Sequence, residues 1–482
     1  MRYTFQDFEK ASNKESFLYA AITDYRASDE YNMALAAEAY YAQQNTTIRE
    51  MVRYVYSQSG LKAPDFTAAN NKIASNFLRR FINQRVTYSL GNGIIWKNTA
   101  TKKRLGKDFD TFVFKTAKAA LIDGAAFGYW NKNRGHTFAA TEFMPLYDED
   151  DGKLRAGARF WSLQWGKKPV CVVLYEEDGY TTYRGNSEGG DLQVTIPKQS
   201  YLKVIQKSEA NGETVVGELN YGVLPVLPLY ANDVKQCPFA GLRAMIDAYD
   251  IIQSGFANDL QDCAGFYMLV GGALGMEPAD LEKFRDQLRF LHIGVVDTDH
   301  SSVTPYTQEV PYAARQTCLE QLRSAMYEAF GALDVTHISS SARTATEINA
   351  AYQPMDEEAD DFEYQIINFI LGILDLTGID DFPDFKRNRI SNQMEQTQMV
   401  MMAKDYLDKE TLLSKLTFIT VDEVAKILKA DEEERKRQEA EMARQAALQG
   451  VLNGTIRQPQ AGSGSGNAGA GGASAGGVRQ QG

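Results

Sequence analysis

Two stretches of helical sequence, residues 239–263 and 313–332, limit the fold of this chain more than any other feature. In both, apolar residues recur at the three- and four-residue spacing that gathers side chains on one face of a helix. These residues are Leu242, Met245, Ile246, Tyr249, Ile252, Phe256 and Leu260 in the first stretch, and Leu319, Leu322, Met326 and Phe330 in the second. Between them, residues 264–312 predict a compact α/β segment with a short strand at 266–270 and a helix near 278–290. The sequence therefore predicts two long helices separated by a small insert.

The first of these stretches also carries a polar stripe on another side. Its members recur at helical spacing and are Asp247, Asp250, Ser254 and Asn258. Such a stripe is expected to face water. It fits equally well an inner water-facing surface and a solvated outer face of the protein.

Upstream of these stretches, the pattern predicts helices first and strands afterwards. Helical spacing covers residues 15–58, 68–90 and 108–122. Residues 125–229 are rich in Tyr, Thr, Val and Trp, and turn signals of the Asp-Gly and Asn-Gly type divide them. This composition predicts antiparallel hairpins.

Downstream, a polar loop of small residues at 334–343 precedes a long helix that is expected from Thr344 to about Leu376. Thr344 and Glu347 have the spacing of a capping box, which marks a helix start. Pro354 lies inside this helix, where it removes a backbone donor and is expected to kink or break it.

The C-terminal part is expected to hold a short strand at 385–390, helices within 393–448, and a tail at 449–482. The tail is almost entirely Gly, Ser, Ala and Gln, a composition typical of a disordered segment. The whole pattern predicts an α+β fold that is mainly helical.

Composition excludes several classes of protein. The net charge of −12 is the opposite of what a protein that grips DNA phosphates over most of its surface needs. No run reaches the ~18 apolar residues that span a bilayer, so no membrane segment is expected. The four cysteines, at 171, 237, 263 and 318, are far apart and are expected to be reduced thiols in a cytoplasmic environment.

The motifs that would identify an enzyme are absent from the sequence. It contains no GxxxxGK(S/T) phosphate loop, no GxGxxG after a predicted strand, no HExxH and no GxSxG. One cluster of possible metal ligands consists of His292, Asp297, Asp299 and His300, in a spacing that matches no known motif. The acidic stretches Asp148–Asp151 and Asp356–Asp361 are interpreted as a hairpin turn and a solvated helix face. We therefore expect no catalytic, cofactor or metal site.

Several short strings, together with the order of the predicted elements, resemble the portal proteins of tailed double-stranded DNA phages, in the branch typical of Gram-positive hosts. The strings are NKIASNF at 71–77, VTYSLG at 86–91, GVLPVLP at 222–228, AMIDAYD at 244–250, ANDL at 257–260 and TATEI at 344–348. They occur in the order that the family shows and span about residues 70–350.

The resemblance implies the architecture of a portal subunit. In that architecture the parts are a wing at 1–235, a first stem helix at 236–263, a clip at 264–312, a second stem helix at 313–333, a tunnel loop at 334–343, a tunnel helix with the return to the wing at 344–392, helices of the crown at 393–448, and the disordered tail at 449–482.

The resemblance also implies a function and partners. The family implies a ring, of twelve copies in this reading, assembled in the host cytoplasm and fixed at one capsid vertex, through which double-stranded DNA is packaged and ejected without sequence readout. It implies contacts with the terminase large subunit, the major capsid or scaffold protein and a head–tail adaptor, and none with a membrane. The residues that it places at the DNA are His337, Ser339, Ser340, Ser341 and Arg343 in the tunnel loop, with Asp247, Asp250 and Ser254 facing the channel from the stem.

Three other functions stay open from the sequence alone. The chain has the composition of another virion structural protein, such as an adaptor or a minor capsid protein. A metal-dependent hydrolase would use His292, Asp297 and His300. A cellular scaffold protein would have a similar composition.

Overall fold

The computed structural model divides the chain into two compact units, residues 1–389 and 390–482. The residues that the structure describes are 3–56, 61–66, 68–132, 134–164, 166–186, 191–208, 212–262, 267–271, 302–306, 312–335, 345–389, 400–404, 406–414, 416, 419 and 421–454.

The N-terminal region is a series of short helices instead of the single helix expected over 15–58. They are α1 (Phe5–Lys10), α2 (Lys14–Ala27), α3 (Asp29–Tyr41) and α4 (Thr46–Glu50), followed by strands β1 (Tyr54–Tyr56) and β2 (Lys62–Pro64). Ser28 separates α2 from α3, because its side chain accepts a hydrogen bond from the backbone N–H of Tyr31 at 3.2 Å. A serine in this position caps a new helix and interrupts the previous one.

The hairpins expected over 125–229 are confirmed. The strands are β4 (Ala125–Asn131), β5 (Arg134–Ala139), β6 (Phe143–Tyr147), β7 (Leu154–Ser162), β8 (Val170–Glu176), β9 (Gly179–Gly185), β10 (Leu192–Gln199), β11 (Leu202–Ser208), β12 (Gly212–Leu219) and β13 (Val226–Tyr230). All their pairings are antiparallel. They form a five-stranded sheet in the order β10-β9-β8-β7-β6, a three-stranded sheet in the order β13-β4-β5, and the pair β11-β12.

The predicted long helices are present as α7 (Phe109–Asp123), α8 (Phe239–Asp262) and α10 (Tyr312–Phe330). The remaining elements of the first unit are α5 (Phe77–Leu90), β3 (Ile94–Trp96), α6 (Thr99–Leu105), β14 (Tyr267–Gly271), β15 (Ser302–Tyr306), α12 (Ala345–Thr377) and β16 (Pro383–Phe385). Strands β14 and β15 pair with each other. The helix expected near 278–290 lies outside the described residues.

Helix α12 continues through Pro354, so the proline does not break it. Tyr352 and Met355, on either side of the proline, are both buried. Their packing offsets the cost of about 3 kcal/mol that an internal proline imposes on a helix. Thr344 lies outside the described residues, so the predicted capping box remains a prediction.

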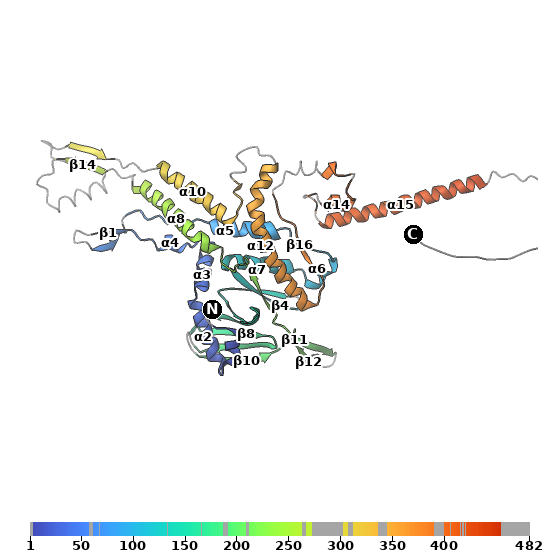
Figure 1. The fold of residues 1–482 in the computed structure, drawn as a ribbon, viewed down its shortest axis with the longest axis horizontal. Coiled ribbons are helices and arrows are strands. Elements are labelled where there is room, and N and C mark those ends of the chain that lie inside the picture. Colours follow the sequence, from blue (N-terminus) through green and yellow to red (C-terminus); the bar gives the residue numbers. More distant parts are fainter. Residues whose placement is uncertain are drawn as a thin grey trace, which may run out of the picture. The chain divides into compact units, whose positions relative to one another are not determined.

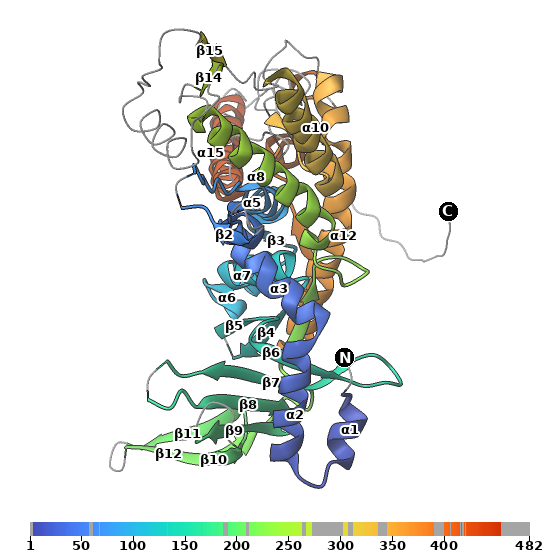
Figure 2. The ribbon, with the colours of Figure 1, turned by 90° about the vertical axis from the view of Figure 1, so that its left-hand side faces the viewer.

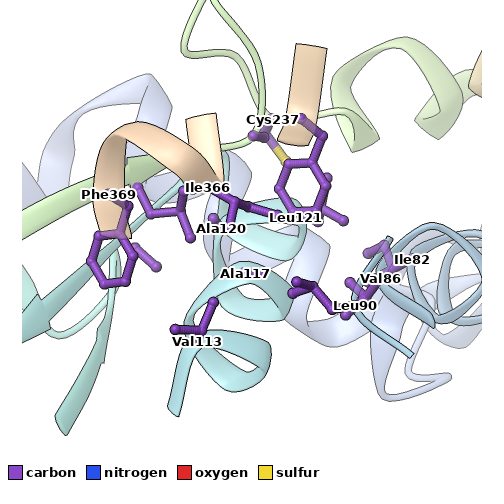
Figure 3. Close-up of a cluster of buried hydrophobic side chains, with 14 of the residues drawn as sticks. Ile82, Val86, Leu90, Val113, Ala117, Ala120, Leu121, Cys237, Ile366 and Phe369 are labelled. Atoms are coloured by element: carbon purple, nitrogen blue, oxygen red, sulfur yellow. The ribbon is translucent and has the colours of Figure 1, made fainter. Parts of the chain in front are cut away.

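The main core of the first unit surrounds α7. Its side chains Val113, Ala117, Ala120 and Leu121 lie between α5 and α12 (Figure 3). Helix α5 contributes Ile82, Val86 and Leu90, and α12 contributes Ile366 and Phe369. The small alanines on α7 permit close approach of its neighbours α5 and α12.

A second core lies under the five-stranded sheet. Helices α1 and α2 cover one face of this sheet (Figure 2), and Phe8, Leu18 and Ile22 pack against Val172 and Leu192. The period-two alternation of β9, where every second residue is buried, suits a sheet covered on one side.

The described part of the second unit includes helices α14 (Lys409–Ser414) and α15 (Val421–Gly454). An ion pair between Lys409 and Asp431 connects these two helices. Helix α15 extends to Gly454, so the expected start of the tail at 449 is wrong.

The strand expected at 385–390 is β16, which ends at Phe385. In the part of the chain that the structure describes, no helix is both long and apolar enough to cross a membrane.

Asp123, at the end of α7, is a buried carboxyl group. One of its oxygens accepts a hydrogen bond from the backbone N–H of Ala140 at 3.1 Å, and the other has no hydrogen-bond partner among the described residues. Burial, with the nearby carboxylate of Glu38 adding to it, raises the pKa of Asp123 well above its ordinary value. Ionisation of this group therefore opposes folding.

We expect the substitution Asp123→Asn to change how stability depends on pH. Because the folded state binds a proton more tightly than the unfolded state, the wild type loses stability as pH rises above the unfolded pKa near 4. The neutral asparagine side chain of the variant does not ionise and loses none. In thermal unfolding between pH 5 and pH 8, the melting temperature of the variant should rise relative to that of the wild type as pH rises. The control variant Asp191→Asn, at an exposed position, should show the same pH dependence of the melting temperature as the wild type. The same pH dependence for Asp123→Asn would contradict the raised pKa of Asp123.

Candidate functional site: the stem helices and their anchors

Helices α8 and α10 form an antiparallel pair (Figure 1). Near one end, Arg315 of α10 pairs with the Asp259 carboxylate of α8. Near the other end, the rings of Tyr249 and Tyr327 both pack against Phe77 of α5, at 5.0 and 6.5 Å between ring centroids. The two predicted stem helices therefore lie side by side, and α5 joins them to the main core.

An extended segment, residues 69–76, runs along the polar stripe of α8. The backbone N–H of Ser75 donates to Asp250 at 3.0 Å, and that of Ile73 donates to the Ser254 hydroxyl at 3.0 Å. The backbone N–H of Asn71 donates to the Asn258 side chain at 2.6 Å. We call these three hydrogen bonds the ladder.

The ladder works because two regular periods nearly coincide. Every second residue of an extended chain advances by about 6.6 Å. Every fourth residue of a helix advances by about 6 Å. Side chains at positions 250, 254 and 258 can therefore meet alternate backbone N–H groups without distortion. Three backbone N–H groups of this segment therefore find acceptors on side chains of α8 in place of a sheet or helix.

The predicted start of the helix expected over 68–90 is wrong, because α5 begins only at Phe77 and the ladder holds the preceding residues extended. Apolar spacing in residues 68–76 suggested a helix because it cannot show that backbone groups have partners elsewhere in the chain. The only signal in the sequence was the polar stripe itself, with its four-residue repeat on α8.

The ladder also corrects the expected surroundings of Asp250 and Ser254. Their exposed fractions are 1% and 0%, so neither side chain faces open water in the chain. Burial raises the pKa of Asp250, while hydrogen bonds from Asn45 and Ser75 oppose the rise. The physical reason is that these side chains complete the hydrogen bonding of residues 69–76.

Asp247 occupies a different position from the other acidic residue of the stripe. It is half-buried, accepts a hydrogen bond from the Tyr40 hydroxyl, and lies 3.9 Å from the Arg243 guanidinium. Its role at a channel stays a prediction.

The end of α10 is anchored to α5 immediately before the predicted tunnel loop. The buried Arg85 guanidinium donates to the carbonyl of Phe330 and pairs with the Glu358 carboxylate at 2.9 Å. Gln84 donates to the carbonyl of Leu333 at 3.0 Å. A cation placed at the last carbonyls of a helix stabilises its C-terminus. Burial lowers the pKa of Arg85, and the Glu358 carboxylate opposes this change.

Gly331 ends α10 in a left-handed conformation with φ of 63°. A side chain here would also meet α12, because a Cβ atom would lie 2.8 Å from the Glu358 side chain and 3.0 Å from the Pro354 carbonyl oxygen. Glycine at 331 therefore permits both the turn and the close approach of α10 to α12.

Two arginines after β16 clamp the acidic stretch of α12. Arg387 pairs with Asp356 at 3.0 Å and with Glu363 at 2.9 Å, and it also contacts Asp360. Arg389 bonds Asp356 at 2.5 Å. Although burial acts to raise the pKa of Asp356, hydrogen bonds from the Tyr88 hydroxyl and from Arg389 lower it overall. The acidic stretch interpreted as a solvated face is therefore partly paired.

Sequence reasoning did not identify Arg85, Arg387 or Arg389. Arg85 carried a weak signal, since it lies between Ile82 and Val86 on the apolar side of α5. Nothing in the sequence pairs 387 or 389 with α12. The turn expected at Asp148–Asp151 is confirmed, because Gly152 N–H donates to the Asp148 carbonyl between β6 and β7.

Several predicted site residues lie outside the described residues. They are His337, Ser339, Ser340, Ser341 and Arg343 of the tunnel loop, and His292, Asp297, Asp299 and His300 of the possible metal cluster. Within the described part of the chain, no group of three or more His, Cys, Asp or Glu side chains is arranged to hold a metal ion.

We expect Ser254→Ala to weaken the ladder. The change removes the acceptor of the part-buried N–H of Ile73, and the lost hydrogen bond costs about 0.5–1.5 kcal/mol. Hydrogen exchange measured by mass spectrometry should then show faster exchange in the peptide that covers residues 69–76. Ser324→Ala, on the exposed face of α10, is the matched control and should leave that peptide unchanged. Unchanged exchange in the Ser254 variant would show that the ladder contributes nothing.

We expect Gly331→Ala to destabilise the junction of α10 and α12 more than Gly378→Ala destabilises the end of α12. Both glycines have φ near 60°, so both changes share a strain of about 1–2 kcal/mol. Only Gly331 also faces close neighbours, because a Cβ atom at Gly378 would meet nothing within 4 Å. Urea unfolding should separate the two variants, and equal losses would argue against the close approach.

Comparison with known proteins agrees with this arrangement. Residues 24–438 match the family described as phage portal protein, SPP1 Gp6-like. The portal protein of Bacillus phage SPP1 is 23% identical over 461 residues, covering 88% of this chain and 87% of that protein. The portal protein of Clostridium phage phiCD119 is 22% identical over 280 residues, covering 52% of this chain and 61% of that protein.

The family match covers most of the chain, including the ladder, the α8–α10 pair and the arginine clamp. It excludes the hydrolase and adaptor readings, since phage portal proteins are structural components of the virion and not enzymes. The chain belongs to the SPP1 Gp6-like family of phage portal proteins.

Proposed function

We propose that copies of this chain form a closed ring at one vertex of the capsid, and that the genomic double-stranded DNA crosses its centre during packaging and ejection. The observation that carries the proposal is the α8–α10 pair, which one chain leaves with large apolar side chains facing outward. Ile251, Leu260 and Tyr312 have exposed fractions of 39%, 54% and 59%. Neighbouring apolar side chains left exposed in this way are typical of a surface that another chain covers.

A ring follows from rotation about an axis that brings one face of a chain against a different face of the next. The number of copies is twelve in this proposal, which rests on the resemblance to the family. In the ring, residues 236–263 and 313–333 form the stem, 264–312 the clip and 334–343 the tunnel loop. Residues 1–235 with 344–392 form the wing, and 393–448 form the crown.

The charge of the chain suits DNA that has to move. Each contact between a cationic side chain and a phosphate releases counterions and adds affinity, which would act as a brake. A chain with a net charge of −12 lowers that affinity. We assign loose contact with DNA to His337, Ser339, Ser340, Ser341 and Arg343, and we place Asp247 near the channel.

The anchors around the tunnel loop support this assignment. Arg85 and Gln84 fix the end of α10 up to Leu333. Nη2 of Arg323 donates to both carboxylate oxygens of Asp334, the first residue of the loop, at 2.9 Å. A loop attached to a rigid support can touch passing DNA without moving the ring.

The partners in this proposal rest on the resemblance to the family and on the absence of a phosphate loop from the sequence. The sequence has no phosphate loop, so ATP hydrolysis would belong to a separate terminase large subunit that docks at the clip. A head–tail adaptor would later take the same end. The wing would contact the major capsid or scaffold protein, after assembly of the ring in the host cytoplasm.

Electron microscopy of the purified protein tests the ring. Negative-stain class averages should show particles with a central opening and close to twelvefold rotational symmetry. Particles that remain single chains at every concentration and ionic strength would refute the proposal.

Deleting residues 337–342 tests the role of the tunnel loop. We expect the variant to form rings as the wild type does, because the anchors at Arg85 and Gln84 remain. DNA packaging, measured as nuclease-protected genome in assembled heads, should fall strongly. Normal packaging by this variant would remove the loop from the proposed mechanism.

A further inference from the structure

A groove of about 380 Å³ runs between α8 and α10. The side chains that line it are Ile251, Ile252, Gly255, Ala314, Arg315 and Cys318. Its floor opens at Gly255, because a Cβ atom added there would meet nothing within 4 Å. The groove is mainly apolar, and the Arg315 guanidinium lies at its edge. Its Nη2 pairs with Asp259, while its Nη1 has no hydrogen-bond partner among the described residues.

A second feature is an arm made of β1, β2 and the residues that follow them. The two strands pair antiparallel, with Tyr54 opposite Pro64, and their exposed surface is large because residues 62–64 are all exposed. Phe66, next to the arm, has an exposed fraction of 92%. A two-stranded hairpin is marginally stable alone in water, so an exposed aromatic side chain beside it indicates that another surface covers it.

The base of the arm and one end of the groove lie at nearly the same level of α8. The base of the arm is fixed where Arg53 donates to the Ala69 carbonyl at 2.7 Å, close to Asn71, which the ladder joins to Asn258. The groove is closed at that level by the pair between Asp259 and Arg315. Copies related by rotation alone are not shifted along the axis, so complementary surfaces in a ring have to lie at one level.

The arm and the groove also lie on different faces of α8. The ladder uses positions 250, 254 and 258, whereas the groove uses 251, 252 and 255. Neighbouring positions on a helix differ by about 100° around its axis. A ring requires two different faces that fit each other, since a face that pairs with itself closes a dimer and leaves no place for a third copy.

We propose that Phe66 of one copy inserts into the α8–α10 groove of the neighbouring copy and that this contact helps to close the ring. The inference rests on the ring of the proposed function. The phenyl ring occupies the open space over Gly255, packs on Ile251 and Ile252, and lies against the Arg315 guanidinium, which attracts the face of an aromatic ring. A second copy is the occupant because the same chain supplies both the exposed aromatic side chain and the apolar groove.

Photo-crosslinking tests the contact directly. Phe66 is replaced by p-benzoyl-phenylalanine, which keeps an aromatic ring at this position, and rings are assembled from an equal mixture of ¹⁴N- and ¹⁵N-labelled chains. After irradiation, mass spectrometry should find Phe66 peptides joined to peptides that contain residues 251–255 or 314–318, with mixed isotope pairs. The same probe at Phe382, which is exposed elsewhere on the chain, is the control and should not reach the groove.

The outcomes separate the inference from the function it rests on. Rings without mixed-isotope links from position 66 to the groove overturn the inference and leave the ring standing. Links only within one chain overturn it as well. Failure of the wild-type protein to form rings overturns the proposed function and the inference together.

A second experiment fills the groove. We expect Gly255→Leu to preserve the fold, since the position is open and leucine favours a helix, but to block the incoming phenyl ring. Gly241→Leu is the matched control, because Gly241 is also open, lies on the same helix, and does not line the groove.

The concentration for half-assembly, measured by mass photometry, should rise about tenfold or more for Gly255→Leu, as expected for losing one buried aromatic side chain. Gly241→Leu should assemble as the wild type does. Circular dichroism confirms that both variants keep their helices. Equal assembly by both variants would overturn the inference.

Discussion

The first unit depends on two kinds of contact that α8 makes on different sides, apolar packing and hydrogen bonds to the backbone of another segment. The apolar side of α8 contacts α10 and the main core, while positions 250, 254 and 258 complete the backbone hydrogen bonding of residues 69–76. The three part-buried N–H groups of the extended segment find their acceptors on this side of α8, which favours this path of the chain along the helix. The ladder thereby fixes the path of the chain from the arm to α5, and α5 in turn holds the end of α10.

The charged side chains form a second set of constraints around the start and end of the predicted tunnel loop and its helix. Arg85 joins α5 to the last turn of α10 and to α12, and Arg387 with Arg389 joins the segment after β16 to the acidic turns of α12. Arg85 is buried, whereas Arg387 and Arg389 are only partly buried and share the Asp356 carboxylate in a network. They hold four separate stretches of sequence in one register, namely α5, α10, α12 and the segment after β16.

The sequence predicted some elements well because interactions between residues close in sequence determine them. The helices α7, α8 and α10 have apolar side chains at regular helical spacing, and the hairpins between 125 and 229 have clear turn signals. The expected helix at 15–58 failed at Ser28, where a single side-chain hydrogen bond starts a new helix. The expected helix at 68–90 began late because the ladder competes with helical bonds for residues 71, 73 and 75. Pro354 did not break α12, since packing at Tyr352 and Met355 outweighs the missing donor.

By itself, the sequence determined the class of fold, the two long helices α8 and α10, and the resemblance to phage portal proteins, because apolar periodicity and short strings are properties of neighbouring residues. Only the tertiary structure decided that Asp250 and Ser254 face residues 69–76 and not water, and that Arg85, Arg387 and Arg389 anchor α10 and α12. These facts join residues more than a hundred positions apart or pair side chains across different elements. Hydrogen-bond and charge complementarity at such separations leaves no periodic trace in the sequence, since either partner alone looks like an ordinary surface residue.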